Sequence, residues 1–195
     1  LYKKNLIAGV DEVGRGSLAG PVVAAAVIFK NSHMINGIRD SKKISFKSRN
    51  YLARLIKKNS YFGIGVASVK EIQKYNILGA SLLSMTRALK KLSKKPGLIL
   101  VDGNVVPKGL KNCRAIVKGD EKVKCISAAS IIAKCFRDKL MIKMSKKFTK
   151  YRFEKNFGYG THEHLKSLKR YGVTTIHRKN FRPVHHILFK NKKKS

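Results

Sequence analysis

The chain is poor in acidic residues: its 195 residues include 10 Asp and Glu against 44 Lys and Arg, a formal net charge of +34 at pH 7. It also has no tryptophan, four prolines and three cysteines. The scarcity of proline, with no Pro/Gly/Ser-rich stretch, argues against a long disordered linker. Cys113, Cys125 and Cys135 are too widely spaced for a CxxC zinc ribbon, and their odd number argues against a disulfide framework, so we expect reduced thiols.

Long hydrophobic runs are also missing. The longest apolar segment, residues 21–29, falls well short of the ~20 residues that a membrane-spanning helix needs. The N-terminus lacks a signal-peptide pattern. These features predict a soluble cytoplasmic protein without membrane contact. At this length, one α/β domain with a sizeable core is the default organisation.

The positive charge predicts a polyanionic partner, because each Lys or Arg that replaces a counterion on a phosphate backbone favours association. Nucleic acid is the natural candidate. The same charge also fits a lysine-rich proteome that places lysine wherever a surface tolerates it. Charge therefore indicates a class of partner but no activity.

The hydrophobic pattern of the first half predicts a hairpin-like start followed by alternating helices and strands. A glycine-bearing turn over residues 14–20 joins the first two strands. The expected elements are strands over 6–10 and 21–29, a helix over 46–58, a strand over 61–69 and a helix over 78–93.

The second half begins with two short apolar strands, 98–101 and 114–117, each followed by an acid. Apolar residues then recur at three- and four-residue intervals over 126–148, which predicts the longest helix. Another helix is expected to open near Thr161, and the last fifteen residues are expected to run out into a solvated basic tail. The whole order predicts an α/β fold with a mixed central sheet flanked by helices and a small helical C-terminal portion.

Four of the ten acids share one kind of position, at or shortly after the end of a predicted strand: Asp11, Glu12, Asp102 and Asp120. Strand ends in open α/β sheets are where ligands gather, so these carboxylates are expected to meet. Oxygen ligands suit Mg²⁺ and Mn²⁺, and two such ions about 4 Å apart support phosphodiester hydrolysis. The alternative is that each acid caps a helix or fills a turn.

One geometric difficulty concerns Glu12. Neighbours in a regular strand point to opposite faces, so if Asp11 faces the metals, Glu12 needs the strand to end or to bulge there. Among the other acids, Asp138 follows Arg137 on the long helix, and an ion pair on a helix surface is its simplest explanation.

These residues lie in motifs that closely resemble bacterial ribonuclease HII, in consistent order from about residue 6 to residue 184. The motifs are 8–16 (Ala-Gly-Val-Asp-Glu-Val-Gly-Arg-Gly), 40–43 (Asp-Ser-Lys-Lys), 101–104 (Val-Asp-Gly-Asn), 118–120 (Lys-Gly-Asp), 127–134 (Ser-Ala-Ala-Ser-Ile-Ile-Ala-Lys) and 158–161 (Gly-Tyr-Gly-Thr). Arg15, where the related ribonuclease HIII typically has lysine, favours the HII branch, as does the lack of the longer N-terminal domain usual in HIII.

The resemblance implies an RNase H-like fold and a monomeric endonuclease that cuts RNA in RNA–DNA hybrids and 5′ of ribonucleotides embedded in duplex DNA. It implies a catalytic domain over residues 1–148, with a helical segment and basic tail over 149–195 packed on the same domain. The family's catalytic and metal-binding carboxylates, which hold Mg²⁺ or Mn²⁺, fall on Asp11, Glu12, Asp102 and Asp120.

The resemblance also implies a substrate-binding set. Gly14, Arg15 and Gly16 correspond to the motif that reads the 2′-hydroxyl at the RNA–DNA junction, which fits the close approach that glycine allows. Tyr159 corresponds to a tyrosine that stacks on the neighbouring deoxyribose. Phosphate contacts fall on Lys42, Lys43 and Lys134.

Other interpretations of the sequence remain open. A non-catalytic RNA-binding protein of the ribosomal kind accounts for the charge but not for the acids, and another nuclease of the RNase H-like superfamily accounts for both. His162, His164 and the pair His185-His186 suggest zinc, but no cysteine or acid completes a tetrahedral set. His177 and Arg178 resemble the family's C-terminal segment and are expected to pack or to touch substrate.

Overall fold

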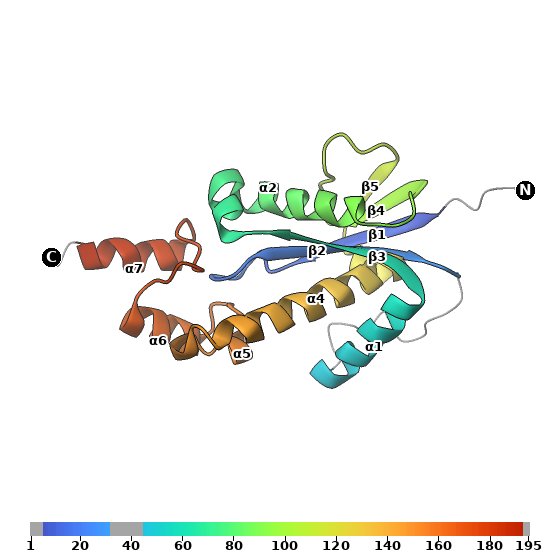
Figure 1. Cartoon of the computed structure of the whole chain (residues 1–195). Helices are drawn as coiled ribbons and strands as arrows, with labels where there is room; N and C mark the ends of the chain where they lie inside the picture. Colours follow the sequence, from blue (N-terminus) through green and yellow to red (C-terminus); the bar gives the residue numbers. More distant parts are fainter. Residues whose placement is uncertain (1–5, 32–44, 193–195) are drawn as a thin grey trace, which may run out of the picture.

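A computed structural model describes residues 6–31 and 45–192 of the chain. Lys42 and Lys43, predicted to contact phosphate, lie outside the described residues. The fold is built on a five-stranded mixed sheet in the order β3-β2-β1-β4-β5 (Figure 1). The strands are β1 (Ile7–Val13), β2 (Val22–Phe29), β3 (Ser60–Ala67), β4 (Leu98–Asp102) and β5 (Cys113–Ile116). The three strands β1 to β3 pair antiparallel, whereas β4 and β5 run parallel to β1.

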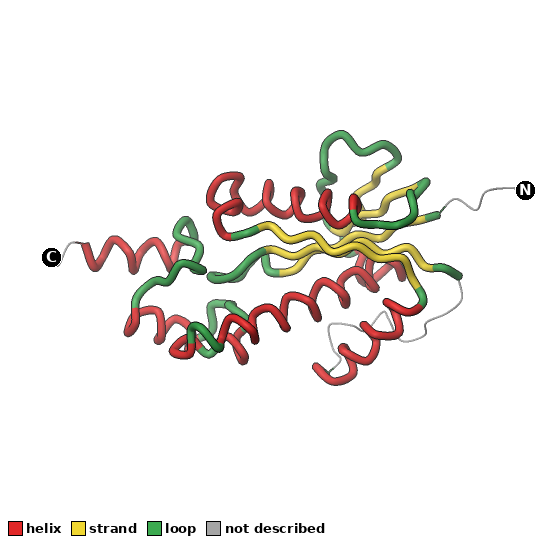
Figure 2. The backbone as a smooth tube through the Cα atoms, in the orientation of Figure 1, coloured by secondary structure: helices red, strands yellow, loops and turns green. Residues whose placement is uncertain are grey.

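Helices cover both faces of the sheet (Figure 2). In Figure 1, α2 lies on one face, and α1 and α4 lie on the other. The helices are α1 (Phe46–Lys58), α2 (Val69–Lys90), α3 (Gly119–Lys122), α4 (Lys124–Ser145), the 3₁₀ helix η1 (Thr149–Tyr151), α5 (Phe153–Asn156), α6 (His162–Tyr171) and α7 (Arg182–Lys192). The predicted α/β architecture, with a mixed sheet between helices, is confirmed.

The central strand β2 explains how the core is divided. Successive side chains of a strand point to opposite faces, and Val23, Ala25 and Val27 pack towards α1 and α4. Ala24 and Ala26 pack against α2 on the other face. Because both faces are covered, the strand is apolar at every position, as its uninterrupted sequence pattern requires.

Two boundaries differ from the sequence prediction near α2. The helix begins at Val69 rather than at residue 78, and β3 ends two residues earlier than expected. Ser68 and Glu71 form a reciprocal capping box at the start of α2, which fixes the helix start. Asn76 interrupts the helix with a φ of 57°, so the regular apolar spacing that predicts a helix begins only after it.

The predicted solvated tail is wrong for most of its length, because residues 182–192 form α7. Val184 on this helix is fully buried beside Tyr151, Phe153 and Leu168. This cluster packs against Met141 near the end of α4. Because the segment is rich in basic residues, a prediction based on charge does not detect the apolar face of α7.

A buried histidine pair stabilises this C-terminal cluster. The Nε2 atoms of His164 and His177 lie 3.1 Å apart, and His177 Nδ1 accepts a hydrogen bond from Thr174 N at 2.9 Å. His164 Nδ1 lies 2.8 Å from the carbonyl oxygen of Tyr159. Two neutral imidazoles satisfy this chain of bonds, with His164 Nδ1 and His177 Nε2 carrying the protons. The predicted role of His177 in packing is confirmed, since it is fully buried.

We expect this pair to make the fold sensitive to acid. Burial lowers the pKa of both histidines, that of His177 to about 3. The unfolded chain binds protons below a pH of about 6.5, whereas the folded chain resists them. The stability is therefore fully present above about pH 6.5 and falls as the pH drops towards 3, by up to about 1.4 kcal/mol per pH unit for each proton.

Urea unfolding at pH 7.5 and pH 5.0 tests this expectation with His177→Gln, which removes the titrating ring. The variant is expected to lose less stability than the parent protein between the two pH values. Replacement of the exposed His162 by Gln is the matched control and is expected to keep the parent's loss. An equal loss in all three proteins would contradict the assignment.

Candidate active site

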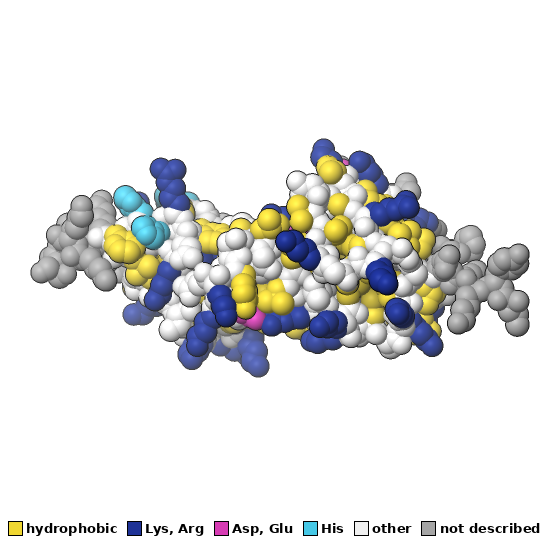
Figure 3. Space-filling model, turned by 90° about the horizontal axis from the view of Figure 1, so that it is seen from above, with side chains coloured by type: hydrophobic (Ala, Val, Ile, Leu, Met, Phe, Trp, Pro, Cys, Tyr) yellow, Lys and Arg dark blue, Asp and Glu magenta, His cyan; other side chains and the backbone are white. Residues whose placement is uncertain are grey.

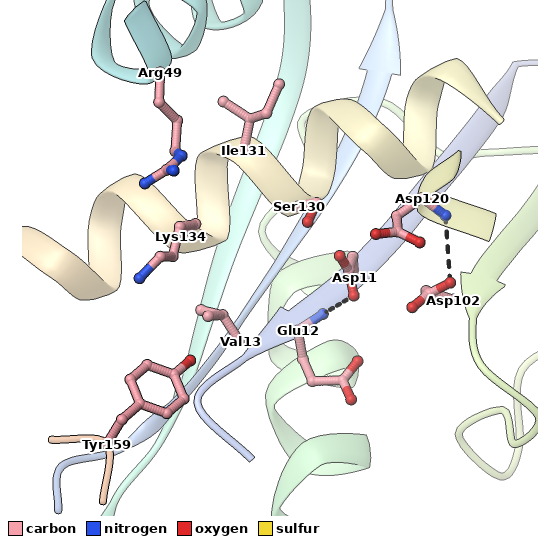
Figure 4. A pocket seen from close by; sticks show the side chains of 10 residues that line it. All are labelled: Asp11, Glu12, Val13, Arg49, Asp102, Asp120, Ser130, Ile131, Lys134 and Tyr159. Atoms are coloured by element: carbon pink, nitrogen blue, oxygen red, sulfur yellow. Dashed lines mark hydrogen bonds between the residues drawn. The ribbon is translucent and has the colours of Figure 1, made fainter. Parts of the chain in front are cut away.

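A pocket of about 350 Å³ opens where β1, β4, α1, α3 and α4 come together. All four predicted carboxylates line it, together with cationic, aromatic and small side chains (Figure 4). Its lining consists of Asp11, Glu12, Val13, Arg49, Asp102, Asp120, Ser130, Ile131, Lys134 and Tyr159. The segments that carry the four predicted acids therefore meet here. Helices α1 and α4 and the segment of Tyr159 contribute the remaining side chains.

Asp11 and Glu12 lie inside β1 rather than after it, because the strand continues to Val13. Their register with β2 is regular, Asp11 opposite Ala25 and Glu12 opposite Ala24, so the bulge considered for Glu12 is absent from this pair of strands. Figure 4 shows the two carboxylates leaving β1 on different sides.

The two strands β1 and β4 end at different levels, which gives both carboxylates access to the pocket. The paired residues run from Ile7 with Leu98 to Val10 with Val101, and β4 ends at Asp102. The part of β1 that carries Asp11 and Glu12 therefore extends beyond the ladder with β4. Where β1 extends past the end of β4, side chains from both faces of β1 can reach the same pocket.

Asp102 and Asp120 are held against each other by backbone hydrogen bonds. Asp102 Oδ1 accepts from the amide of Gly119 at 2.7 Å and from the amide of Asp120 at 3.3 Å. The Ser127 hydroxyl on α4 donates to the carbonyl oxygen of Asp120. The short turn of α3 thus places Asp120 beside the end of β4.

The environment of β1 opposes the ionised forms of its two acids. Burial, followed by the nearby charge of Glu12, raises the pKa of Asp11 well above its ordinary value, while a hydrogen bond from Ser130 partly offsets this. Burial also raises the pKa of Glu12, against the opposing effect of Arg15. The Arg15 Nη1 atom lies 3.2 Å from Glu12 Oε1.

These oxygens fit a divalent cation. The donors are carboxylates only, the ligand type that Mg²⁺ and Mn²⁺ prefer. A cation among them would relieve the repulsion from Glu12, which adds to the effect of burial in raising the pKa of Asp11. With the side chains as placed, no three His, Cys, Asp or Glu residues within 6–31 and 45–192 converge into a complete metal cluster. The same finding gives no support to zinc at the histidines of these ranges.

Lys134 and Arg49 add positive charge on the other side of the pocket. Lys134 Nζ pairs with Asp138 Oδ1 at 2.6 Å, and Arg49 Nη1 lies 3.7 Å from Asp138 Oδ2. Asp138 is only 1% exposed. Its interpretation as a surface partner of Arg137 is therefore wrong. Asp138 points inward and, one helical turn after Lys134, pairs with the side chains of Lys134 and Arg49.

Residues 14–21, which we call the recognition loop after the role that the resemblance predicts for residues 14–16, begin directly after β1. A side chain at Gly14, whose φ is +93°, would collide with the Arg137 guanidinium. At Gly16, by contrast, nothing lies within 4 Å of an added Cβ. The fold therefore requires glycine at position 14, whereas the space beside Gly16 is open to a ligand.

Tyr159 is half-buried between α5 and α6 and lines the pocket. Its ring centroid lies 5.6 Å from Lys134 Nζ and 5.5 Å from Arg137 Cζ. At these distances both cations can interact with the ring face. The predicted stacking residue therefore lies beside a predicted phosphate contact.

Comparison with known proteins identifies the family. The sequence profile described as Ribonuclease HII matches residues 8–192. The chain belongs to the ribonuclease HII family. It is 55% identical over 185 residues to Ribonuclease HII of Pelagibacter ubique (strain HTCC1062), which covers 94% of this chain and 99% of that protein. It is 48% identical over 190 residues to Ribonuclease HII of Thermotoga maritima, which covers 96% of this chain and 79% of that protein.

Solved structures agree with the RNase H-like fold. The crystal structure of the ribonuclease H2 from Pyrococcus horikoshii OT3 matches with a TM-score of 0.80 at 26% identity, covering 96% of this chain and 99% of the other. As a ribonuclease HII, the chain is an endonuclease that acts on the RNA of RNA–DNA hybrids. The alternative of a non-catalytic RNA-binding protein is thereby wrong. In the part of the chain that the structure describes, no helix has the length and apolarity to cross a membrane.

Sequence reasoning about this ribonuclease HII missed Arg49. Its segment is one of many basic stretches among 44 Lys and Arg, and no spacing connects it with the acids. The only available signal is indirect: Asp138 is an acid on the helix that carries Lys134. A buried acid needs partners, and here one partner comes from α1.

We expect Asp138→Asn to impair both stability and substrate affinity. The Lys134 and Arg49 side chains would lose the buried charge that holds them, so the free energy of unfolding should fall by about 1–3 kcal/mol and KM for a hybrid should rise. Glu163→Gln is the matched control, because its pair with Arg152 is exposed on both sides and is worth about 0–1 kcal/mol. Equal unfolding midpoints and KM values for the two variants would contradict the role of Asp138.

Proposed function

We propose that the enzyme cuts on the 5′ side of ribonucleotides embedded in duplex DNA as well as within longer hybrids, leaving 5′-phosphate and 3′-hydroxyl ends. The observation that carries the proposal is the pocket itself, in which four carboxylates lie beside Tyr159 and Lys134. The recognition loop follows immediately on the strand that bears Asp11 and Glu12. The two acids of β1, which we assign to metal binding, and the loop that we assign to contact with the sugar are thus adjacent in the chain.

Asp11, Glu12, Asp102 and Asp120 would hold Mg²⁺ or Mn²⁺ in this site. Such ions, when bound as a pair, activate water and stabilise the leaving oxygen of a phosphodiester. The chain's own contribution is to hold these oxygens in place: Ser130 fixes Asp11, and the amides of Gly119 and Asp120 fix Asp102.

The remaining pocket residues would bind and orient the nucleic acid. Lys134 and Arg49 offer positive charge to backbone phosphates, and the Tyr159 ring offers a flat surface to a sugar. The open space beside Gly16 allows the backbone to approach a ribose, whose 2′-hydroxyl distinguishes RNA from DNA. The strongly basic surface supports this binding at a distance.

We expect Asp11→Asn and Asp102→Asn to abolish cleavage of a duplex with one ribonucleotide while largely preserving its binding, because each loses a charged metal ligand. Asp11→Asn should not lower the unfolding temperature, since it removes a charge that burial disfavours. Cleavage and binding assays in Mg²⁺ and in Mn²⁺ measure the effect. Glu154→Gln, at an exposed acid, is the control and should cleave normally. Full activity of Asp11→Asn would refute the assignment.

A pair of glycine variants separates folding from recognition. Gly16→Ala should leave the unfolding midpoint unchanged but raise KM for the single-ribonucleotide duplex, because the methyl group would occupy the space left for the sugar. Gly14→Ala should lower the unfolding midpoint, because it meets the Arg137 side chain at a positive φ. If Gly16→Ala cleaved with an unchanged KM, the loop would not approach the ribose.

A substrate panel tests the function as a whole. It compares a duplex containing one ribonucleotide, a long RNA–DNA hybrid and a four-way DNA junction, with and without EDTA. The proposal requires cleavage of the first two only, dependent on a divalent ion. Cleavage of the junction would indicate another nuclease activity of the same superfamily, and cleavage of the long hybrid alone would refute the action on embedded ribonucleotides.

A further inference from the structure

Two arginines near the recognition loop are completely buried: Arg137 on α4 and Arg178, which precedes α7. Their hydrogen bonds go to backbone carbonyl oxygens. Burial of a guanidinium is costly, and accordingly burial lowers the pKa of both, that of Arg178 to about 9. Arg178 still remains charged at neutral pH, so the cost must be offset by what the side chain binds.

The carbonyls that they bind belong mainly to the recognition loop. Arg178 Nη1 donates to the carbonyl of Arg15 at 2.8 Å, and Arg178 Nε donates to that of Gly20 at 2.9 Å. Arg137 donates to the carbonyls of Ala19 and Pro21, both at 3.0 Å. Two guanidinium forks thus fasten both ends of the loop to the interior of the protein.

Arg137 also joins the loop to the segment that carries Tyr159. Its Nη1 atom donates to the carbonyl of Phe157 at 2.9 Å. The amides of Leu18 and Ala19 in turn donate to the carbonyl of Gly158 at 2.8 and 3.2 Å. The recognition loop and the tyrosine segment therefore form one hydrogen-bonded unit.

Arg178 determines which way one particular peptide group faces. In a planar trans peptide, the C=O and the following N–H point in opposite directions. Because the Arg15 carbonyl points to the buried Arg178 side chain, the amide of Gly16 points the opposite way, and Gly16 itself is exposed. A buried side chain thereby presents a backbone donor to the surface at the place where a sugar is expected.

We propose that Arg178 and Arg137 are positioning residues for ribose recognition: Arg178 turns the Arg15–Gly16 peptide so that its amide faces the ribose, and Arg137 fixes the loop to the Tyr159 segment. The inference rests on the proposed function, since it assumes that this loop reads the sugar. Lysine cannot replace either arginine, because one ammonium group cannot reproduce a fork that holds two or three carbonyls in a plane.

Arg178→Lys tests the role with a ratio that folding alone does not change. The ratio is the inhibition constant of an all-DNA duplex divided by KM for the same duplex with one ribonucleotide. We expect it to fall about tenfold, the worth of one hydrogen bond to the ribose, with kcat changed less than about threefold. Ile56→Ala, in the core between α1 and the sheet, is the destabilised control and should keep the parent's ratio. An unchanged ratio in Arg178→Lys would overturn the proposal.

Hydrogen exchange of the parent protein tests the same idea if Arg178→Lys fails to fold. With EDTA present to prevent cleavage, the Gly16 amide should exchange fast in the free protein and slowly with the ribonucleotide duplex, but not with the all-DNA duplex. Equal exchange with both duplexes would overturn the proposal. If the parent cuts only long hybrids, the proposed function fails, and the ratio is then measured with the hybrid, so that the positioning role is tested separately.

Discussion

The architecture depends on placing four carboxylates around one pocket in a protein that is otherwise strongly basic. Burial and mutual repulsion oppose the ionised forms of Asp11 and Glu12, so the acids need opposing charge at close range. Arg15 supplies part of it to Glu12, and the surface in Figure 3, where Lys and Arg are spread widely and acids are almost absent, supplies a positive field at longer range. The divalent cation that we propose for this site would supply the remaining opposing charge.

Helix α4 connects the parts of the site. Residues about one and two turns apart share a helix face, and α4 uses this spacing to contact several elements in succession. Ser130 reaches Asp11, Lys134 lines the pocket, and Arg137 holds the recognition loop. Displacement of α4 relative to β1 would therefore disturb the proposed chemistry, the proposed phosphate contacts and the proposed recognition of the sugar together.

Much of this organisation could be predicted from the sequence, because the decisive signals are local. The apolar strands, the bounds of α1 and the four acids that line one pocket all follow from short patterns. The start of α2 could not be predicted so easily, because a capping box and a kink at Asn76 replace regular apolar spacing. Likewise, helix α7 could not be predicted because its sequence is rich in basic residues, although Val184 on it is buried.

Contacts between residues far apart in the sequence could not be predicted, for a different physical reason. Arg49 reaches the pocket from α1, and its carboxylate neighbour Asp138 lies 89 positions further along the chain. Arg178 acts on Arg15 across a separation of 163 residues. The chain has 44 Lys and Arg. Its composition therefore does not distinguish a buried Lys or Arg that binds other parts of the protein from one that is exposed to solvent. Only the folded arrangement does so.

The most direct test of the central claim is the thermal unfolding of the free enzyme, without nucleic acid, as Mn²⁺ or Mg²⁺ is added. If the carboxylates form a cation site, the unfolding midpoint should rise with the ion concentration and reach saturation, as linkage requires for a ligand that binds the folded state. The increase should be lost in the double variant Asp11→Asn/Asp102→Asn, and potassium at equal ionic strength should not reproduce it. A midpoint that does not respond to either divalent ion, or that responds equally in the double variant, would contradict the account.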